Sequence, residues 1–481
     1  MLFNSIDFAI FLPLVFISFW FIIPKSNRCQ NLFLLFVSYV FYSWWDWRFL
    51  SLIIISSIVD YLVGISLGKE ENIVKRKYLL LISICVNIGL LGFFKYSNFF
   101  IESFITAFSF FGNQLNYDTF YIILPVGISF YTFQTLSYSI DVYERKMNPS
   151  KDVIAFFAFV SFFPQLVAGP IERAANLLPQ FFNKRKFDYA KAIDGMRQIL
   201  WGFFKKLVIA DNCAPFVNEI FSHHGELPGS ILWIGILFFT FQIYCDFSGY
   251  SDIAIGTARL FNFSLNKNFD FPYFSRDIAE FWRRWHISLS SWFRDYVYIP
   301  MGGSYVANAK KIRNLFVVFL LSGFWHGANW TFIIWGAINA VYYLPLMFMQ
   351  KNRKHLDVPA SGRLFPSFLE ARQITVTFFM TLIAWVFFRA NNITHAFEYL
   401  DGMFSLSVFV KPNISVDQVS LIMIIFIFVI VEWTQREKEY TLETVLKKYP
   451  RTLRWIGYIY ILIFIIGFGG FEKTEFIYFA F

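Results

Sequence analysis

Residues 314–350 contain no Asp, Glu, Lys or Arg, and they contain a single histidine, His326. A titratable side chain within an apolar segment of this length is unfavourable in a membrane and is usually kept for function. A neutral imidazole can take a proton from a hydroxyl and return it, which is what acyl transfer to an alcohol requires. The alternative is a structural histidine that is hydrogen-bonded to a neighbouring helix. Small, aromatic and amide residues around His326 favour the chemical interpretation. They are Gly323, Trp325, Gly327, Ala328, Asn329 and Trp330.

A second histidine, His286, lies in residues 281–296, a segment rich in tryptophan and arginine. If this segment is helical, His286 lies on one apolar face, and we expect the helix to end at the Gly302-Gly303 pair. We interpret His286 as a partner of His326 that either orients a donor or shares proton movement. A Trp- and Arg-rich amphipathic segment is also typical of a membrane-surface anchor, so this alternative stays open. The expected apolar face comprises Trp282, Trp285, His286, Leu289 and Phe293.

Candidate substrate-binding residues lie beside both histidines. Arg283 and Arg284 could hold the phosphates of a donor such as a coenzyme A thioester or an acyl carrier protein, because guanidinium groups bind phosphate through paired hydrogen bonds. Aromatic and amide side chains next to the histidines could line the same site. These are Trp285, Trp325 and Asn329.

A third polar group lies in residues 241–252, at what we expect to be the end of an apolar helix. Asp246 could orient a histidine or bind a cation, whereas polar residues at helix ends are more often structural hydrogen-bonding groups. The group comprises Gln242, Tyr244, Asp246, Ser248 and Asp252. We count Gln242 and Asp246 among the candidate substrate-binding or donor-binding residues.

Several other chemistries have little support in the sequence. It has no nucleophile elbow, phosphate-binding loop, dinucleotide fingerprint or zinc-ligand spacing. The four cysteines are scattered without a paired spacing, so they predict neither a disulfide framework nor a metal site. We therefore expect no metal and no tightly bound cofactor, and a thioester donor would be a substrate.

The composition is that of an integral membrane protein. Of 481 residues, 57% are hydrophobic and 16% are charged, whereas soluble domains carry about 25% charged residues. Residues 8–24 follow a start without positive charge and precede no cleavage motif, so we interpret them as a retained first transmembrane helix. We expect a single all-α, polytopic membrane domain over residues 1–481.

Apolar runs of about 17–25 residues can cross a bilayer as helices, and the sequence predicts about eleven or twelve of them. The run 153–171 is interrupted by Pro164 and by Gly169-Pro170, so we expect a re-entrant or broken helix there. The expected crossings are residues 8–24, 29–45, 49–68, 78–94, 119–140, 207–221, 227–245, two within 314–350, 373–388, 418–431 and 455–471.

The Lys and Arg residues are concentrated in the segments between the predicted crossings, so they do not indicate a nucleic-acid-binding surface. With the N-terminus outside, the inner segments hold 36 of the 42 Lys and Arg residues, as the positive-inside rule requires. Within these, residues 150–206 and 265–313 are long enough for re-entrant or interfacial helices on the cytoplasmic side. Residues 314–350 are expected to form the hairpin that carries His326.

At these residues the chain resembles the membrane-bound O-acyltransferase (MBOAT) family, and within it the branch of bacterial alginate and cell-wall polysaccharide O-acetylases. The resemblance implies a ring of transmembrane helices with an inner tunnel for the donor and an outer funnel for the acceptor. It also implies that His326 is the catalytic histidine and that His286 is the second active-site histidine. The motifs that carry it are residues 1–5, 124–134, 163–171, 244–252, 277–290, 295–300 and 323–330.

We therefore expect a transferase in the cytoplasmic membrane of a bacterium, which moves an acetyl group from a cytoplasmic thioester to an extracytoplasmic polysaccharide hydroxyl. The outer loops are too short to bind a long glycan alone. An extracytoplasmic partner protein resembling an acetyltransferase or esterase is therefore expected to complete the transfer.

Two alternatives stay open. The same fold could move another acyl group, such as D-alanine to teichoic acid or a fatty chain to a lipid. A proton-coupled transporter would also use membrane histidines, but it is expected to show inverted repeats and paired broken helices, and the sequence has neither.

Overall fold

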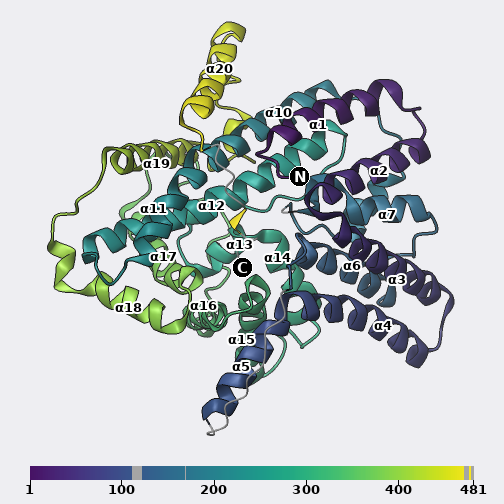
Figure 1. Ribbon diagram of the computed structural model, residues 1–481, viewed down its shortest axis with the longest axis horizontal. Coiled ribbons are helices and arrows are strands. Elements are labelled where there is room, and N and C mark those ends of the chain that lie inside the picture. The colour runs from purple at the N-terminus through teal and green to yellow at the C-terminus, as the bar shows by residue number, and fades with distance from the viewer. Residues whose placement is uncertain (111–121, 168, 471–475, 478–481) are drawn as a thin grey trace. The chain divides into compact units, whose positions relative to one another are not determined.

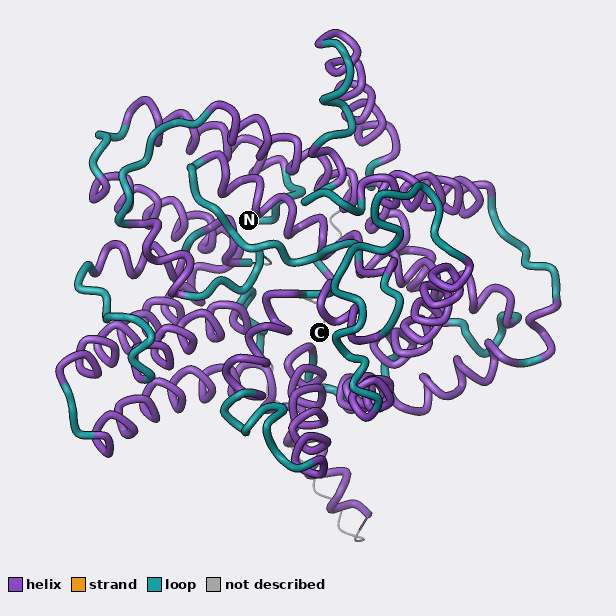
Figure 2. Tube along the Cα trace, turned by 180° about the vertical axis from the view of Figure 1, so that it is seen from behind, coloured by secondary structure: helices purple, strands orange, loops and turns teal. Residues whose placement is uncertain are grey.

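The fold consists of helices joined by loops (Figures 1 and 2). The computed structural model describes residues 1–110, 122–167, 169–470 and 476–477, and these residues contain no β-strand. The predicted all-α class is confirmed.

The described residues form two compact units. The first comprises residues 1–195 with 257–266, and the second comprises residues 196–256 with 267–481. The expectation of one domain over the whole chain stays a prediction.

The first unit contains the N-terminal helices (Figure 1). In chain order they are α1 (Ile6–Ile17), η1 (Ser18–Ile22), α2 (Asn27–Asp46), η2 (Trp47–Phe49), α3 (Leu50–Lys69), α4 (Ile73–Leu91), η3 (Gly92–Tyr96), α5 (Ser97–Phe110), α6 (Ile128–Tyr143), α7 (Val153–Ser161), α8 (Phe163–Leu166), α9 (Ala174–Leu177), η4 (Leu178–Phe181) and the first part of α10 (Tyr189–Phe203).

Buried polar groups join three of these apolar helices. Asp60 of α3 is fully buried and accepts hydrogen bonds from Ser83 and Asn87 of α4 and from Ser139 of α6. The Asn87 and Ser139 bonds are 2.8 and 2.7 Å long. Interhelical hydrogen bonds of this kind select the neighbours of helices whose surfaces are otherwise uniformly apolar.

The break predicted around Pro164 is present. Phe162 leaves the helical conformation between α7 and α8 (φ −52°, ψ 105°), and Pro164 lies in the first turn of α8. The carbonyl oxygen of Phe159 accepts hydrogen bonds from the side chains of Gln134 (2.9 Å) and Gln165 (3.2 Å). Side-chain amides thus form hydrogen bonds with a backbone carbonyl near the break, as a broken helix in apolar surroundings requires.

The run 119–140 does not form one helix as expected. Residues 119–121 lie outside the described residues, residues 122–127 are not helical, and α6 begins only after them. Pro125 and Gly127 explain this late start, because Gly127 has a left-handed φ of +75° that an α-helix cannot contain.

The second unit contains the remaining helices. In chain order they are the end of α10, η5 (Phe204–Ala210), α11 (Asp211–Ser222), α12 (Gly229–Leu260, up to residue 256), η6 (Pro272–Phe274), α13 (Ile278–Arg284), α14 (Ile287–Phe293), η7 (Arg294–Tyr298), α15 (Asn308–His326), α16 (Trp330–Phe348), α17 (Phe368–Arg389), α18 (Ile393–Phe404), η8 (Leu406–Phe409), α19 (Val416–Gln435), η9 (Thr441–Glu443) and α20 (Arg451–Phe468).

Seven helical stretches of the described residues are long and apolar enough to cross a membrane, judged by length and composition. The chain is therefore a polytopic membrane protein. The expected number of eleven or twelve crossings, their ring-like arrangement and the orientation of the N-terminus stay predictions. The seven stretches are Asn27–Lys69, Ile73–Ser109, Gly229–Leu260, Trp330–Phe348, Phe368–Arg389, Val416–Gln435 and Arg451–Phe468.

Candidate active site

The hairpin predicted within residues 314–350 is formed by α15 and α16. His326 is the last residue of α15, and Asn329 caps α16 by accepting a hydrogen bond from the backbone N–H of Thr331 (3.0 Å). The Asn329 amide also donates to the carbonyl oxygen of Asn391 (2.8 Å). Asn329 thus ties the turn after His326 to a second loop, and its role in substrate binding stays a prediction.

Two glycines let the hairpin helices approach each other closely. A Cβ atom at Gly323 of α15 would meet the carbonyl oxygen of Phe332, and one at Gly336 of α16 would meet that of Phe319. No side chain can stand between backbones at this separation. The end of α15, and with it His326, is therefore held against α16.

The segment that carries His286 is not the single helix that its periodicity predicts. α13 ends at Arg284, His286 has a left-handed φ of +42°, and α14 begins at Ile287. A non-helical segment fixes this break. The N–H of Asp270 donates to the carbonyl of Arg284, and the N–H of Ile287 donates to that of Asn268, both at 2.9 Å. The left-handed residue interrupts the helical ladder, yet His286 is buried as predicted, with 1% of its surface exposed.

The expected stop after this segment is confirmed. η7 ends at Tyr298, and the chain then turns through Gly302 (φ +97°) and Gly303 (φ +54°). Glycine occupies these conformations without the steric penalty of a Cβ atom.

The two histidines meet within the second unit. The ring centroids of His286 and His326 are 6.3 Å apart, and each residue is 1% exposed. Trp325 lies beside both rings, at 5.7 Å from His286 and 5.1 Å from His326. On its other sides His326 packs against Trp335 (5.1 Å) and Phe388 (5.2 Å). The structure thus brings together the two residues that the sequence singled out, 40 positions apart.

The surroundings of His286 are mostly aromatic. The ring of Phe247 stands edge-on to it at 4.6 Å, and Phe269 lies 6.3 Å away. His286 lies outside the seven candidate spans, and burial lowers its pKa because an imidazolium here would be charged without water. Trp285, fully buried, packs against Phe269 (5.1 Å) and Trp385 (5.0 Å) rather than lining an open surface.

A cavity of about 460 Å³ lies among α13, α14, α15 and α16. Its lining includes the basic side chains of Arg283, Arg294 and Lys311. It also includes Ser322, which precedes His326 by one helical turn on α15. The cavity therefore combines positive charge with residues of α14 and α15 that lie close to the histidines in sequence, although neither histidine is among its lining residues.

The two arginines named from the sequence have structural partners. Arg283 lines the cavity and donates to the carbonyl oxygens of Asn352 (2.7 Å) and His355 (2.6 Å). Arg284 is buried and pairs with Glu280 (3.0 Å) and Asp270 (2.9 Å). Donor binding by either residue stays a prediction.

Arg294 and Lys311 are cavity residues that sequence reasoning did not single out. The Arg294 side chain is 61% exposed, and it pairs with Asp295 (2.6 Å). Nothing in their spacing separated these two from other basic residues of the segment. Only the packing of η7, which begins at Arg294, against α15, which contains Lys311, places both at one cavity.

The polar group of residues 241–252 does not end a helix, because α12 continues to Leu260. Asp246 forms a buried ion pair with Lys206 (2.8 Å) and accepts a hydrogen bond from the backbone N–H of Ile477 (2.8 Å). Lys206 also pairs with Asp211 (2.8 Å). Polar side chains remain inside this apolar helix because buried partners satisfy them.

Gln242 stands apart from these pairs. Its Oε1 atom is buried and has no hydrogen-bond partner among the residues that the structure describes. Its predicted contact with substrate stays a prediction.

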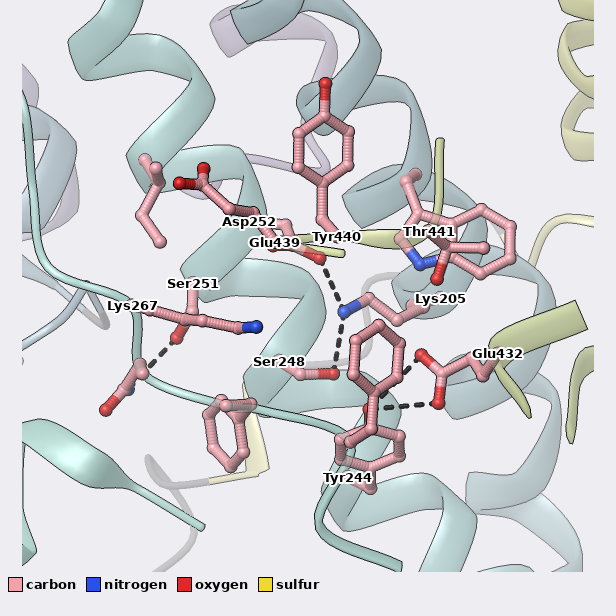
Figure 3. Close-up of a pocket in the computed structure, with 15 residues that line it drawn as sticks. Lys205, Tyr244, Ser248, Ser251, Asp252, Lys267, Glu432, Glu439, Tyr440 and Thr441 are labelled. Atoms are coloured by element: carbon pink, nitrogen blue, oxygen red, sulfur yellow. Dashed lines mark hydrogen bonds and ion pairs between the residues drawn. The ribbon is translucent and has the colours of Figure 1, made fainter. Parts of the chain in front are cut away.

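A second, small cavity of about 20 Å³ is lined by polar residues of α12 and its neighbours (Figure 3). Lys205 pairs there with Asp252 (2.6 Å) and donates to Ser248 (2.9 Å). The Tyr244 hydroxyl lies within hydrogen-bonding distance of both carboxylate oxygens of Glu432, at 3.1 and 3.0 Å. This volume suits about one water molecule.

Sequence reasoning placed Lys205 and Lys206 among the basic residues of an inner loop. Both are buried, at 3% and 1% exposure, and both pair with acidic side chains of the second unit. Their burial was not predicted, because two of the acidic partners, Asp246 and Asp252, lie at least 40 positions away in the sequence.

A polar partner of His286 was also missed. Asn268 lies 3.1 Å from the Nδ1 atom of His286 and belongs to the non-helical segment that fixes the break between α13 and α14. No motif or spacing in the sequence connects the two residues.

The apolar helices and the two buried histidines beside a basic cavity define a class: a multi-pass membrane protein with an enclosed histidine pair. The profile of the membrane-bound O-acyltransferase family matches residues 39–396, a range that includes both histidines. The chain belongs to the MBOAT family, and it is an O-acyltransferase.

Individual relatives support this assignment over most of the chain. The chain is 40% identical over 408 residues to a probable alginate O-acetylase of Pseudomonas aeruginosa, an alignment that covers 84% of this chain and 75% of the relative. It is 35% identical over 438 residues to a peptidoglycan O-acetyltransferase of Helicobacter pylori, covering 85% and 80%. A teichoic acid D-alanyltransferase of Bacillus subtilis is more distant, at 29% identity over 252 residues, covering 50% and 63%.

Proposed function

We propose that this protein transfers an acetyl group from a cytoplasmic thioester to a hydroxyl of an extracytoplasmic polysaccharide. The observation that carries the proposal is the pair of buried imidazoles, 6.3 Å apart, next to a basic cavity. The relatives named as alginate O-acetylase and peptidoglycan O-acetyltransferase support acetyl as the group and polysaccharide as the acceptor.

In the proposed reaction, the acceptor hydroxyl oxygen bonds to the thioester carbonyl carbon as its proton moves to the imidazole of His326. The carbon–sulfur bond then breaks, and the leaving thiolate takes the proton back. The tryptophan and phenylalanine rings around His326 exclude water, which strengthens electrostatic interactions and limits hydrolysis of the thioester.

The donor, in this proposal, is acetyl-CoA or an acyl group carried on a protein thioester. Arg294 and Lys311 meet its phosphate groups in the cavity, whose lining along α15 extends to Ser322, four residues before His326. The protein then lies in the cytoplasmic membrane of a bacterium with its N-terminus outside, which matches the distribution of basic residues.

An extracytoplasmic partner protein completes the transfer to the polymer in this proposal. Its support is the shortness of the expected outer loops, of which the longest is residues 390–417. Full activity of the purified chain alone on long polysaccharide would contradict the dependence on a partner.

The test reconstitutes the protein in proteoliposomes and adds the envelope fraction of the cells that produce it. It measures the transfer of labelled acetyl from a thioester to a polysaccharide. We expect His326→Gln to lower the rate by a factor of ~10²–10⁴, because a general base contributes about that much. His395→Gln is the matched control, because His395 lies in α18 and stacks on His224, with ring centroids 4.3 Å apart. An unchanged rate in His326→Gln would overturn the proposal.

A D-alanyl group is the second candidate, and the similarity to a teichoic acid D-alanyltransferase favours it specifically. Mass spectrometry of the modified polymer separates the two, since D-alanyl and acetyl groups differ in mass. Detection of D-alanyl ester in place of acetyl ester would replace the first proposal.

A further inference from the structure

The contacts of Asn268 show which atom donates the hydrogen in the hydrogen bond between Asn268 and His286. The Asn268 Oδ1 atom lies 3.1 Å from His286 Nδ1, 2.9 Å from the Ser288 hydroxyl and 3.3 Å from the Ser288 backbone nitrogen. A backbone N–H can only donate, so the Asn268 atom that receives it is the amide oxygen rather than the amide nitrogen.

The other end of the amide agrees with this orientation. The Asn268 Nδ2 atom donates to the hydroxyl oxygen of Ser251 on α12 at 3.1 Å. Ser251 is among the labelled residues around the small polar cavity (Figure 3). Both faces of the amide are therefore engaged, and a flipped amide would place its NH₂ group against the N–H of Ser288.

The Ser288 hydroxyl lies 3.4 Å from His286 Nδ1, but it donates its hydrogen to the nearer Asn268 Oδ1 at 2.9 Å. An amide oxygen cannot donate, so the hydrogen between Asn268 and His286 belongs to His286 Nδ1. A neutral imidazole carries one N–H, which leaves Nε2 as a hydrogen-bond acceptor. The Nε2 atom is buried and has no hydrogen-bond partner within the described part of the chain. An imidazolium would add a buried, unpartnered N–H and an uncompensated charge, and burial disfavours that form.

The position of Asn268 is fixed by backbone bonds and does not depend on its side chain. Its carbonyl oxygen accepts from the N–H of Ile287, and two residues later the N–H of Asp270 donates to Arg284. These bonds lie on either side of His286, so they hold the amide oxygen beside the ring. The geometry is that of a carbonyl group that fixes the tautomer of a functional histidine.

We infer that Asn268 is a positioning residue that keeps the hydrogen of His286 on Nδ1, so that His286 takes part in the acyl transfer as a proton acceptor through Nε2. This inference rests on the proposed function, and it decides between the two roles considered for His286. A ring whose Nε2 carries no hydrogen cannot orient a thioester by donating from that atom to the carbonyl oxygen. It can accept a hydrogen bond from a hydroxyl or a water that reaches Nε2.

The first experiment reads the tautomer without any activity. We would record ¹⁵N NMR spectra of the full-length protein in detergent with labelled histidine, and assign the His286 signals by their loss in His286→Gln. We expect a hydrogen on Nδ1 and a bare Nε2, and in Asn268→Leu a second population with the hydrogen on Nε2. A hydrogen on Nε2 in the wild-type protein would overturn the inference, whatever the protein transfers.

The second experiment measures whether the pH profile of the acyl-transfer rate moves to higher or to lower pH in a variant. Asn268→Asp keeps an acceptor at Nδ1 but adds a negative charge, which raises the pKa of His286 by about one to three units. His326 is a titratable group that faces His286, with the ring centroids 6.3 Å apart, and it is the same in both proteins. An acceptor must be neutral, so the acidic limb of the kcat profile that His286 sets should move to higher pH by that amount. A limb that stays in place, or activity that extends to higher pH as expected for a donor, would contradict the inference.

Steady-state kinetics of these variants and of one control variant separates positioning from folding. Asn268→Leu should lower kcat at least about tenfold with little change in the KM for the thioester, and Asn268→Asp should recover activity above the shifted limb. Asn212→Leu is the matched control, because the side chain of Asn212, in the same unit, donates to the backbone carbonyls of Leu207, Val208 and Phe468. Equal loss in Asn268→Leu and Asn212→Leu would indicate a structural role alone and overturn the inference.

Discussion

At the scale of single residues, the basic side chains of the second unit divide into two groups. Arg284 is buried and held by Glu280 and Asp270, so it contributes to the fold around His286. Arg294 is largely exposed and lines the cavity, so its guanidinium can meet a ligand. An arginine can meet a donor when its side chain is exposed at the cavity and is not held by buried acidic partners. Closeness to a histidine in the sequence does not decide this.

We expect Arg294→Gln to raise the KM for the thioester donor about tenfold while kcat changes little. A charge-assisted hydrogen bond to phosphate contributes about 1.5–3 kcal/mol, and loss of binding shared by ground and transition states appears in KM. Steady-state kinetics with varied donor concentration provides the measurement. Arg48→Gln is the control, because Arg48 forms a comparable exposed pair with Asp46 in the first unit. Equal KM values for wild type and Arg294→Gln would exclude the contact.

At the scale of elements, the hairpin of α15 and α16 depends on glycine where its helices meet. Gly323 faces the carbonyl oxygen of Phe332, so even one methyl group has no room. A packed backbone contact cannot relax by rotating a side chain. The helices must move apart, and the position of His326 moves with them.

We therefore expect Gly323→Ala to lower the free energy of unfolding by about 1–3 kcal/mol, the usual effect of overpacking. Thermal unfolding in detergent, followed by intrinsic tryptophan fluorescence, measures the loss. Gly89→Ala is the control, because Gly89 lies within α4 and a Cβ there meets nothing within 4 Å. That variant should be neutral or slightly more stable, since alanine favours helix over glycine. A Gly323→Ala protein as stable as the wild type would refute the close contact.

Elements also show where sequence reasoning succeeds and where it fails. The hairpin of His326 was predictable, because a long run without charges is a local signal. The break at His286 was not, because the backbone of residues 268–270 imposes it from another part of the chain. Hydrophobic periodicity reports only on residues within one segment, so it could not predict the left-handed conformation of His286.

At the scale of the whole molecule, composition is the strongest predictor. Sixty-six phenylalanines and few charges predict a polytopic helical protein, and the helices confirm it. The buried ion pairs of Lys205 and Lys206 could not be predicted, because their acidic partners include residues at least 40 positions away. Charge counts assign such lysines to a loop, whereas tertiary pairing buries them.

Orientation in the membrane gives a prediction at this scale. We expect a cysteine at Ser361 to face the cytoplasm and one at Asn413 to face outward, in a background with the exposed Cys29 and Cys85 replaced by serine. The reason is the excess of Lys and Arg in the segments assigned inside. Labelling of spheroplasts with a membrane-impermeant maleimide should modify the Asn413→Cys protein at once, and the Ser361→Cys protein only after permeabilisation. The reverse pattern would invert the assigned topology.

At His286, the backbone conformation is unfavourable for any residue with a Cβ atom, whereas the proposed chemistry requires an imidazole side chain. A left-handed conformation is disfavoured for residues with a Cβ by about 1–2 kcal/mol, and glycine would adopt it freely. Selection for thermal robustness alone would therefore favour glycine there and remove the ring. An imidazole at this position means that the chain retains a strained residue, as expected where strain accompanies function.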